Sequence, residues 1–89
     1  MTGETDKKPL RLIESPNEFA IISEDEKSVL SRTYVEPSSG NWAAFSSESF
    51  KHLIGNFDIK KDALDAAYNY LRGQYKNREI VDLTSRAQE

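Results

Sequence analysis

The sequence predicts an α+β domain in which an antiparallel β-meander of three to four strands packs against one long C-terminal amphipathic helix. In the first half of the chain, short segments rich in β-branched and aromatic residues are separated by turn residues. A single long segment with apolar residues at helical spacing follows, and no proline interrupts it. A chain of 89 residues can build one modest hydrophobic core, so a second domain is not expected.

Residues 10–36 carry a short apolar stretch and the first strands of the predicted meander. Residues 10–13 and 19–22 are short apolar segments on either side of Ser15-Pro16-Asn17, a strong turn sequence. Residues 28–36 alternate between two faces, which is typical of an antiparallel strand with one face partly exposed to solvent. One face would hold Val29, Ser31, Thr33 and Val35, and the other Leu30, Arg32 and Tyr34. The charged residues 24–27 would form the solvated tip of the hairpin between these strands.

Residues 37–41 predict a break between strands. The segment that follows them has two interpretations. Residues 42–45 are the next candidate strand, and residues 46–57 could form either a helix or a further strand. In the helix, Ser47 would be the N-cap, and the apolar positions Phe50, Leu53, Ile54 and Phe57 would share a face. In the strand, Phe50, His52 and Ile54 would alternate with Lys51 and Leu53. We favour the strand, because it gives the segment of Trp42 a partner on each side.

A helix is predicted from about residue 59 to residue 76, with Asp58 as its N-cap. Ala63, Ala67 and Leu71 lie on its apolar face, which is of the kind that packs on a sheet. Because the two alanines have small side chains, the helix axis should approach the sheet closely.

Both ends of the chain are polar. Residues 1–9 are expected to be a disordered lead-in, residues 10–76 the domain, and residues 77–89 a polar tail. Ile80, Val81 and Leu83 interrupt that tail and could form a short edge strand. No apolar leader is present, and the longest apolar run has only the four residues 42–45. We therefore expect a cytoplasmic protein with no membrane partner.

The composition argues against several kinds of chemistry. The chain has no cysteine, which excludes disulfides, thiolate metal sites and cysteine nucleophiles. His52 is its only histidine, so a multi-histidine metal site cannot form, and no carboxylate or nucleophile is marked as its catalytic partner. No phosphate-binding glycine loop or dinucleotide-binding sequence is present. We expect neither an enzyme nor a bound cofactor or metal.

Several side chains are candidates for binding. Tyr34 beside Arg32, and Tyr68 near the edge of the apolar face of the helix, have the composition of a contact surface. The interpretation we favour over contact is a structural one, in which such an aromatic belongs to a cross-strand pair that covers the sheet. A second candidate is a small basic patch where the last strand meets the helix, formed by Lys51, His52, Lys60 and Lys61. We favour an ordinary solvated face for these cations over a phosphate-binding site, because Asp58, Asp62 and Asp65 in the same stretch weaken the positive potential.

One stretch of the chain resembles known domains. Asn41-Trp42-Ala43-Ala44-Phe45, followed by Gly55-Asn56-Phe57-Asp58 and the alanine-containing helix, is similar to two groups. One is a set of small bacterial domains of unknown function, and the other is the AP2-like arm at the amino end of some phage and transposon integrases. The resemblance implies a sheet-plus-helix topology and, for the integrase arm, DNA binding through the sheet. Those families usually have Thr or Ser where Ile59 stands here, and no functional residue is carried over.

These observations together predict a small non-enzymatic binding module. A protein is the expected partner, either another protein or a second copy of the chain, in an accessory or regulatory role of a bacterial or phage kind. The alternative is nucleic-acid binding through the sheet. The charge distribution favours the first reading, because nine acids against five bases give residues 1–50 a net charge of −4.

Overall fold

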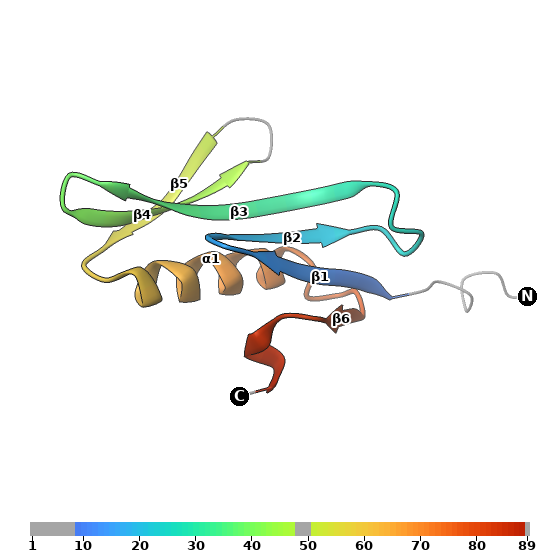
Figure 1. The fold of residues 1–89 in the computed structure, drawn as a ribbon. Coiled ribbons are helices and arrows are strands. Elements are labelled where there is room, and N and C mark those ends of the chain that lie inside the picture. The colour runs from blue at the N-terminus through green and yellow to red at the C-terminus, as the bar shows by residue number, and fades with distance from the viewer. Residues whose placement is uncertain (1–8, 48–50, 89) are drawn as a thin grey trace, which may run out of the picture.

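The computed structural model describes residues 9–47 and 51–88, which form a sheet with one helix on one face (Figure 1). The strands are β1 (Leu10–Ser15), β2 (Glu18–Ile22), β3 (Val29–Ser38), β4 (Asn41–Ser47), β5 (Lys51–Phe57) and β6 (Ile80–Asp82). The helix α1 (Lys60–Gln74) follows β5, and a 3-10 turn, η2 (Ser85–Gln88), follows β6. The strand order in the sheet is β5-β4-β3-β2-β1-β6.

The α+β class is confirmed, but the described chain has more strands than the three to four predicted. Its sheet has six strands, and α1 is not the C-terminal element, because β6 and η2 come after it. β1 to β5 pair antiparallel, whereas β6 lies parallel to β1. Leu10 N donates to Glu79 O at 3.0 Å, and Leu83 N donates to Leu12 O at 2.9 Å. The chain after α1 thus returns to form backbone hydrogen bonds with the edge of β1. Short apolar segments in the sequence do not predict such a non-local pairing.

The predicted break at residues 37–41 is shorter in the structure. β3 extends to Ser38 and pairs Pro37 with Trp42, and only Ser39 and Gly40, at φ 51° and 84°, form the turn. Val35 N donates to Asn17 O at 2.9 Å, so the backbone N atoms of Val35 and of Pro37 point to the β2 side of β3. β2 begins only at Glu18, opposite Tyr34, so the missing N–H of Pro37 leaves no bond of the ladder unmade.

For residues 51–57 the strand interpretation is confirmed, while Phe50 lies outside the described residues. A bulge changes the expected alternation within β5. Leu53 pairs with Phe45 and Gly55 with Ala44, so Ile54 is the extra residue between them. Ile54 packs against the buried core, whereas Leu53 is 47% exposed on the other face.

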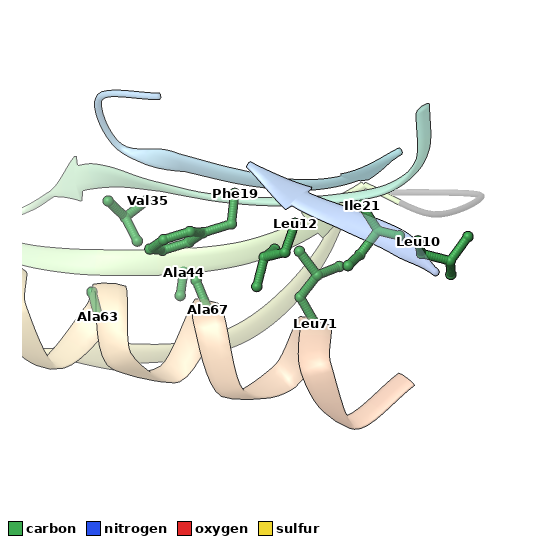
Figure 2. Packing of buried hydrophobic residues seen from close by; sticks show 9 residues of the cluster. All are labelled: Leu10, Leu12, Phe19, Ile21, Val35, Ala44, Ala63, Ala67 and Leu71. Atoms are coloured by element: carbon green, nitrogen blue, oxygen red, sulfur yellow. The ribbon is translucent and has the colours of Figure 1, made fainter. Parts of the chain in front are cut away.

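The core lies between α1 and the strands (Figure 2). Its buried members are Leu10, Leu12, Phe19, Ile21, Val35, Ala44, Ala63, Ala67 and Leu71. Ala63, Ala67 and Leu71 are fully buried and recur every four residues along α1. Thr33 Oγ1 on β3 donates a hydrogen bond to Ala67 O at 3.1 Å. This contact between a strand side chain and the helix backbone shows how closely α1 approaches the sheet.

The N-cap of α1 is Ile59, so the prediction of Asp58 as the cap was wrong. Ile59 has the extended backbone of a cap residue, with φ −127° and ψ 152°, but its side chain makes no capping hydrogen bond. The helix therefore begins one residue later than Asp58 would place it. Packing of its buried stripe, rather than a local capping signal, determines that start.

Candidate interaction surface

The sheet face opposite α1 carries an apolar row that crosses three strands. The register places Leu53 of β5 beside Phe45 of β4, and Phe45 beside Tyr34 of β3. The rings of Tyr34 and Phe45 are stacked, with centroids 5.5 Å apart. We call Tyr34, Phe45 and Leu53 the apolar stripe. It begins at the outer strand of the sheet, where Leu53 is 47% exposed.

Two arginines of the strands are paired with carboxylates. Arg32, on the same face as Tyr34, lies 3.5 Å from the carboxylate of Glu18. Arg11 on β1 lies 2.5 Å from the carboxylate of Glu26. The structure thus brings the two predicted contact residues, Arg32 and Tyr34, onto one face, and both arginines of the strands have their charge compensated there.

β5 forms one edge of the sheet, and no strand of the described chain lies beyond it. Alternate N–H and C=O groups of an edge strand point away from its sheet and can pair with another strand. The opposite edge is different, because β6 has only three residues and is followed at once by the contact of Leu83 with Leu12 and by η2. β5, with seven residues, is the longer edge, and it carries Leu53 of the apolar stripe.

The proposed basic patch is spread along β5 rather than gathered. Lys51 and His52 begin the strand and Lys60 and Lys61 follow its end, which separates the two pairs by about 20 Å at ~3.3 Å per residue. Lys61 Nζ lies 3.3 Å from the carboxylate of Asp65, and Lys60 Nζ lies 5.3 Å from the ring centroid of Trp42. The His52 ring lies 6.0 Å from that of Tyr70.

Tyr68 lies in a polar cluster that the sequence did not indicate. Its hydroxyl donates to Asp82 Oδ2, and Arg72 Nη1 donates to the same oxygen at 3.2 Å. Thr84 donates to Asp82 Oδ1 from its backbone N at 2.9 Å and from its hydroxyl at 2.6 Å. The Asp82 side chain is only 9% exposed, so this carboxylate ties β6 to α1. The short sequence Asp82-Leu83-Thr84, a potential local turn, was the available signal.

Two further contacts hold the chain after β6. Arg86 forms an ion pair with Asp65 on α1, and its guanidinium lies 5.8 Å from the Phe19 ring and 5.4 Å from the Tyr68 ring. Ser85 N donates to Glu14 Oε1 at 2.5 Å. We call the contacts of Asp82, Thr84, Ser85 and Arg86 the C-terminal clasp. Because Tyr68 belongs to it, the hydroxyl of Tyr68 has an intramolecular role.

The pKa values of the two clasp aspartates reflect this pairing. Burial by itself raises the pKa of Asp82, but hydrogen bonds from Thr84 and Tyr68 and the charge of Arg72 outweigh it and hold the pKa below the ordinary value. For Asp65, burial likewise raises the pKa, but the contacts with Arg86 and Lys61 outweigh burial and hold the pKa below the ordinary value. Both aspartates therefore favour their charged forms in the folded protein.

A cavity of about 320 Å³ lies between the β1–β2 turn and the start of α1. It is lined by Glu14, Ser15, Pro16, Asn17, Phe19, Lys60 and Leu64. Its two charged residues, Glu14 and Lys60, have opposite signs. Asn17 Oδ1 has no hydrogen-bond partner among the described residues, but it is buried from solvent and therefore from a ligand in the open cavity. The lining matches no particular ligand, and we assign none.

The part of the chain that the structure describes contains no group of three or more His, Cys, Asp or Glu side chains placed to hold a metal ion. Within the same residues, no helix has the length and apolar character needed to cross a membrane. Comparisons with models of protein families, with curated proteins and with solved structures found no match. We therefore infer function from the surfaces of the chain itself.

Proposed function

We propose that this protein is a small non-enzymatic binding module that contacts another polypeptide through the apolar stripe and the adjoining edge of β5. The observation that carries the proposal is their continuity: Leu53 belongs to both. Outward N–H and C=O groups of an edge strand are complementary to the backbone of another chain, and an apolar row beside them adds side-chain contacts.

Charge favours a protein over a nucleic acid as the partner. Phosphate-binding surfaces need cations available to neutralise the backbone. Arg11 and Arg32 on the open face are already paired with Glu26 and Glu18. Nucleic-acid binding through the sheet remains the alternative function. An accessory or regulatory role in the cytoplasm, of a bacterial or phage kind, is part of the proposal and agrees with a sequence that has no cysteine.

A photo-crosslinking amino acid at position 53 tests the proposed surface in cells that produce the protein. We expect covalent adducts to polypeptides, identified by mass spectrometry, when the probe replaces Leu53. The matched control places the same probe at Leu83, which is 55% exposed and follows β6 at the other edge. Equal adducts from both positions, or none from position 53, would contradict the proposal.

A salt titration separates the two partner classes. We expect no binding of generic duplex or single-stranded DNA, even at low ionic strength. Binding that weakens steeply as salt increases would show neutralised phosphates and would replace the protein-partner proposal with the nucleic-acid alternative.

A further inference from the structure

β6 lies beside β1 at the end of the sheet (Figure 1) and is held more by polar contacts than by buried apolar side chains. Among its apolar residues only Ile80 packs against the core, whereas Val81 is 40% exposed and Leu83, just after it, 55% exposed. The buried side chains of this segment are polar, since Thr84 is 1% exposed and Asp82 9%. Segments with few buried apolar contacts open at a lower free energy than the core does.

The groups that receive this segment belong to elements with other support. The N–H of Leu10 and the C=O of Leu12 bond to it, and they lie on β1, which also pairs with β2. Tyr68 and Arg72 donate to Asp82, and they lie on α1, whose buried residues pack against the sheet. We call Leu10, Leu12, Tyr68 and Arg72 the β1 edge site. If the segment leaves, this site keeps a strand edge and two donors for a carboxylate.

We propose that the C-terminal clasp is an autoinhibitory strap, which opens while the rest of the fold stays intact and uncovers the β1 edge site for an extended segment of another polypeptide. The sequence of the clasp defines what the site accepts. Such a segment runs parallel to β1 and has an apolar residue two positions before an aspartate, as Ile80 and Asp82 are placed. Its backbone would pair with β1, which is strand addition, and its aspartate would accept the two hydrogen bonds from α1.

The tether of the clasp determines how tightly another segment can bind. A segment joined to its site by a short linker acts at an effective concentration in the millimolar range, so a free segment competes poorly with it. The intact chain should therefore bind such a segment weakly, and a change that weakens the clasp should strengthen binding. The β1 edge site lies at the opposite end of the sheet from β5, so this inference does not depend on the apolar stripe.

A disulfide that can be formed and reduced tests whether the clasp must open. Arg11 and Val81 are direct partners in the β1–β6 pair, and the chain has no cysteine of its own. Neighbouring strands lie about 4.8 Å apart, which is within reach of a disulfide. A fluorescent peptide of residues 78–89 should bind the full chain with Arg11→Cys and Val81→Cys at least about tenfold more tightly when reduced than when oxidised. Equal binding by the two forms would overturn the inference.

Weakening the clasp should have the opposite effect to locking it. The full chain with Asp82→Ala should bind the same peptide about tenfold more tightly than the wild type, because its own segment has lost the carboxylate that the peptide supplies. Leu83→Ala is the matched control, since it changes an exposed side chain of the same segment and should bind as the wild type does. A peptide with the same Asp82→Ala change should bind none of these chains.

Arg86→Ala keeps the test decisive if circular dichroism shows that Asp82→Ala does not fold. This substitution removes the ion pair between the clasp and Asp65 on α1 and leaves the β1 edge site unchanged. It should also tighten binding of the wild-type peptide. A peptide that binds no folded variant, or that binds the weakened and the wild-type chains equally, would overturn the inference. Neither result would affect the crosslinking experiment at position 53, which tests the other edge.

Discussion

Asp82 shows how one side chain can hold two elements together. Its two oxygens accept hydrogen bonds from Thr84 on one side and from Tyr68 and Arg72 on the other. Every partner is a donor, and the side chain is almost fully buried, so its negative charge is compensated where solvent contributes little. In the polar tail only the short sequence Asp82-Leu83-Thr84 marked this acid, because its other partners, Tyr68 and Arg72, lie on α1.

Asp82→Asn should destabilise the fold by about 1–3 kcal/mol, because it removes the charge that Arg72 compensates and replaces one acceptor oxygen by a donor nitrogen. Urea unfolding at neutral pH measures the change. Glu24→Gln is the control, since Glu24 is exposed in the β2–β3 connection and a surface change there should stay within about 0.5 kcal/mol. Equal effects of the two substitutions would show that the clasp does not contribute to stability.

At the scale of the element, α1 forms although its first turn is poorly suited to a helix. Ile59 supplies no capping oxygen, and Lys60 and Lys61 place cations at the positive end of the helix dipole. The buried residues of α1 compensate for this, because they pack against four strands of the sheet. The sequence located this helix to within two residues at each end.

Ile59→Ser should stabilise the protein by about 0.5–1 kcal/mol, because a serine hydroxyl can accept a hydrogen bond from a free N–H of the first turn. Serine is preferable to aspartate here, since Asp58 and Asp62 are close in sequence. The midpoint of urea unfolding reports the gain. Ile59→Ala removes the same apolar side chain without providing an acceptor, and a serine variant no more stable than the alanine variant would disprove the capping argument.

The ambiguity of residues 46–57 also belongs to the element scale. Ile54 and Phe57, three residues apart, both pack against the core because the bulge in β5 places Ile54 and Gly55, consecutive residues, toward the same side, whereas Leu53 lies on the open face. A bulge thus mimics the spacing that indicates a helix. Only the pairing partner, β4, decides between the two structures, and the availability of that partner is a property of the whole sheet.

At the scale of the whole molecule, the first and the last strand of the described chain pair with each other. β6 adds to the edge of β1, and the clasp fixes it to α1, so the first strand and the last described segment stabilise each other. Pairing of this kind closes a long loop, and its cost in chain entropy must be offset by the buried contacts around Thr84 and Asp82.

The stability of the molecule should decrease in acid. The folded-state pKa values of Asp65 and Asp82 lie below their ordinary value of 3.8. The unfolded chain therefore binds more protons, and this contribution is present above the ordinary pKa and is lost as the pH falls from about 4 through the folded-state values. Urea unfolding at a series of pH values should show the decrease, and it should be shallower in the double variant Asp65→Asn, Asp82→Asn. An unchanged slope in that variant would assign acid sensitivity to other carboxylates.

The sequence by itself determined the features of the fold that depend on local periodicity and composition. The alternation separated Ser31, Thr33 and Val35, which are buried, from Arg32 and Tyr34 on the open face, although Val29 does not follow it, because the pairing with β2 shifts register between Ser31 and Val29. The apolar period of α1 predicted the close approach of Ala63 and Ala67. The tertiary structure alone decided the bulge in β5, the return of β6 to β1 and the burial of Asp82. Each of these depends on a partner distant in the chain, and backbone pairing between distant segments leaves little trace in the order of residue types.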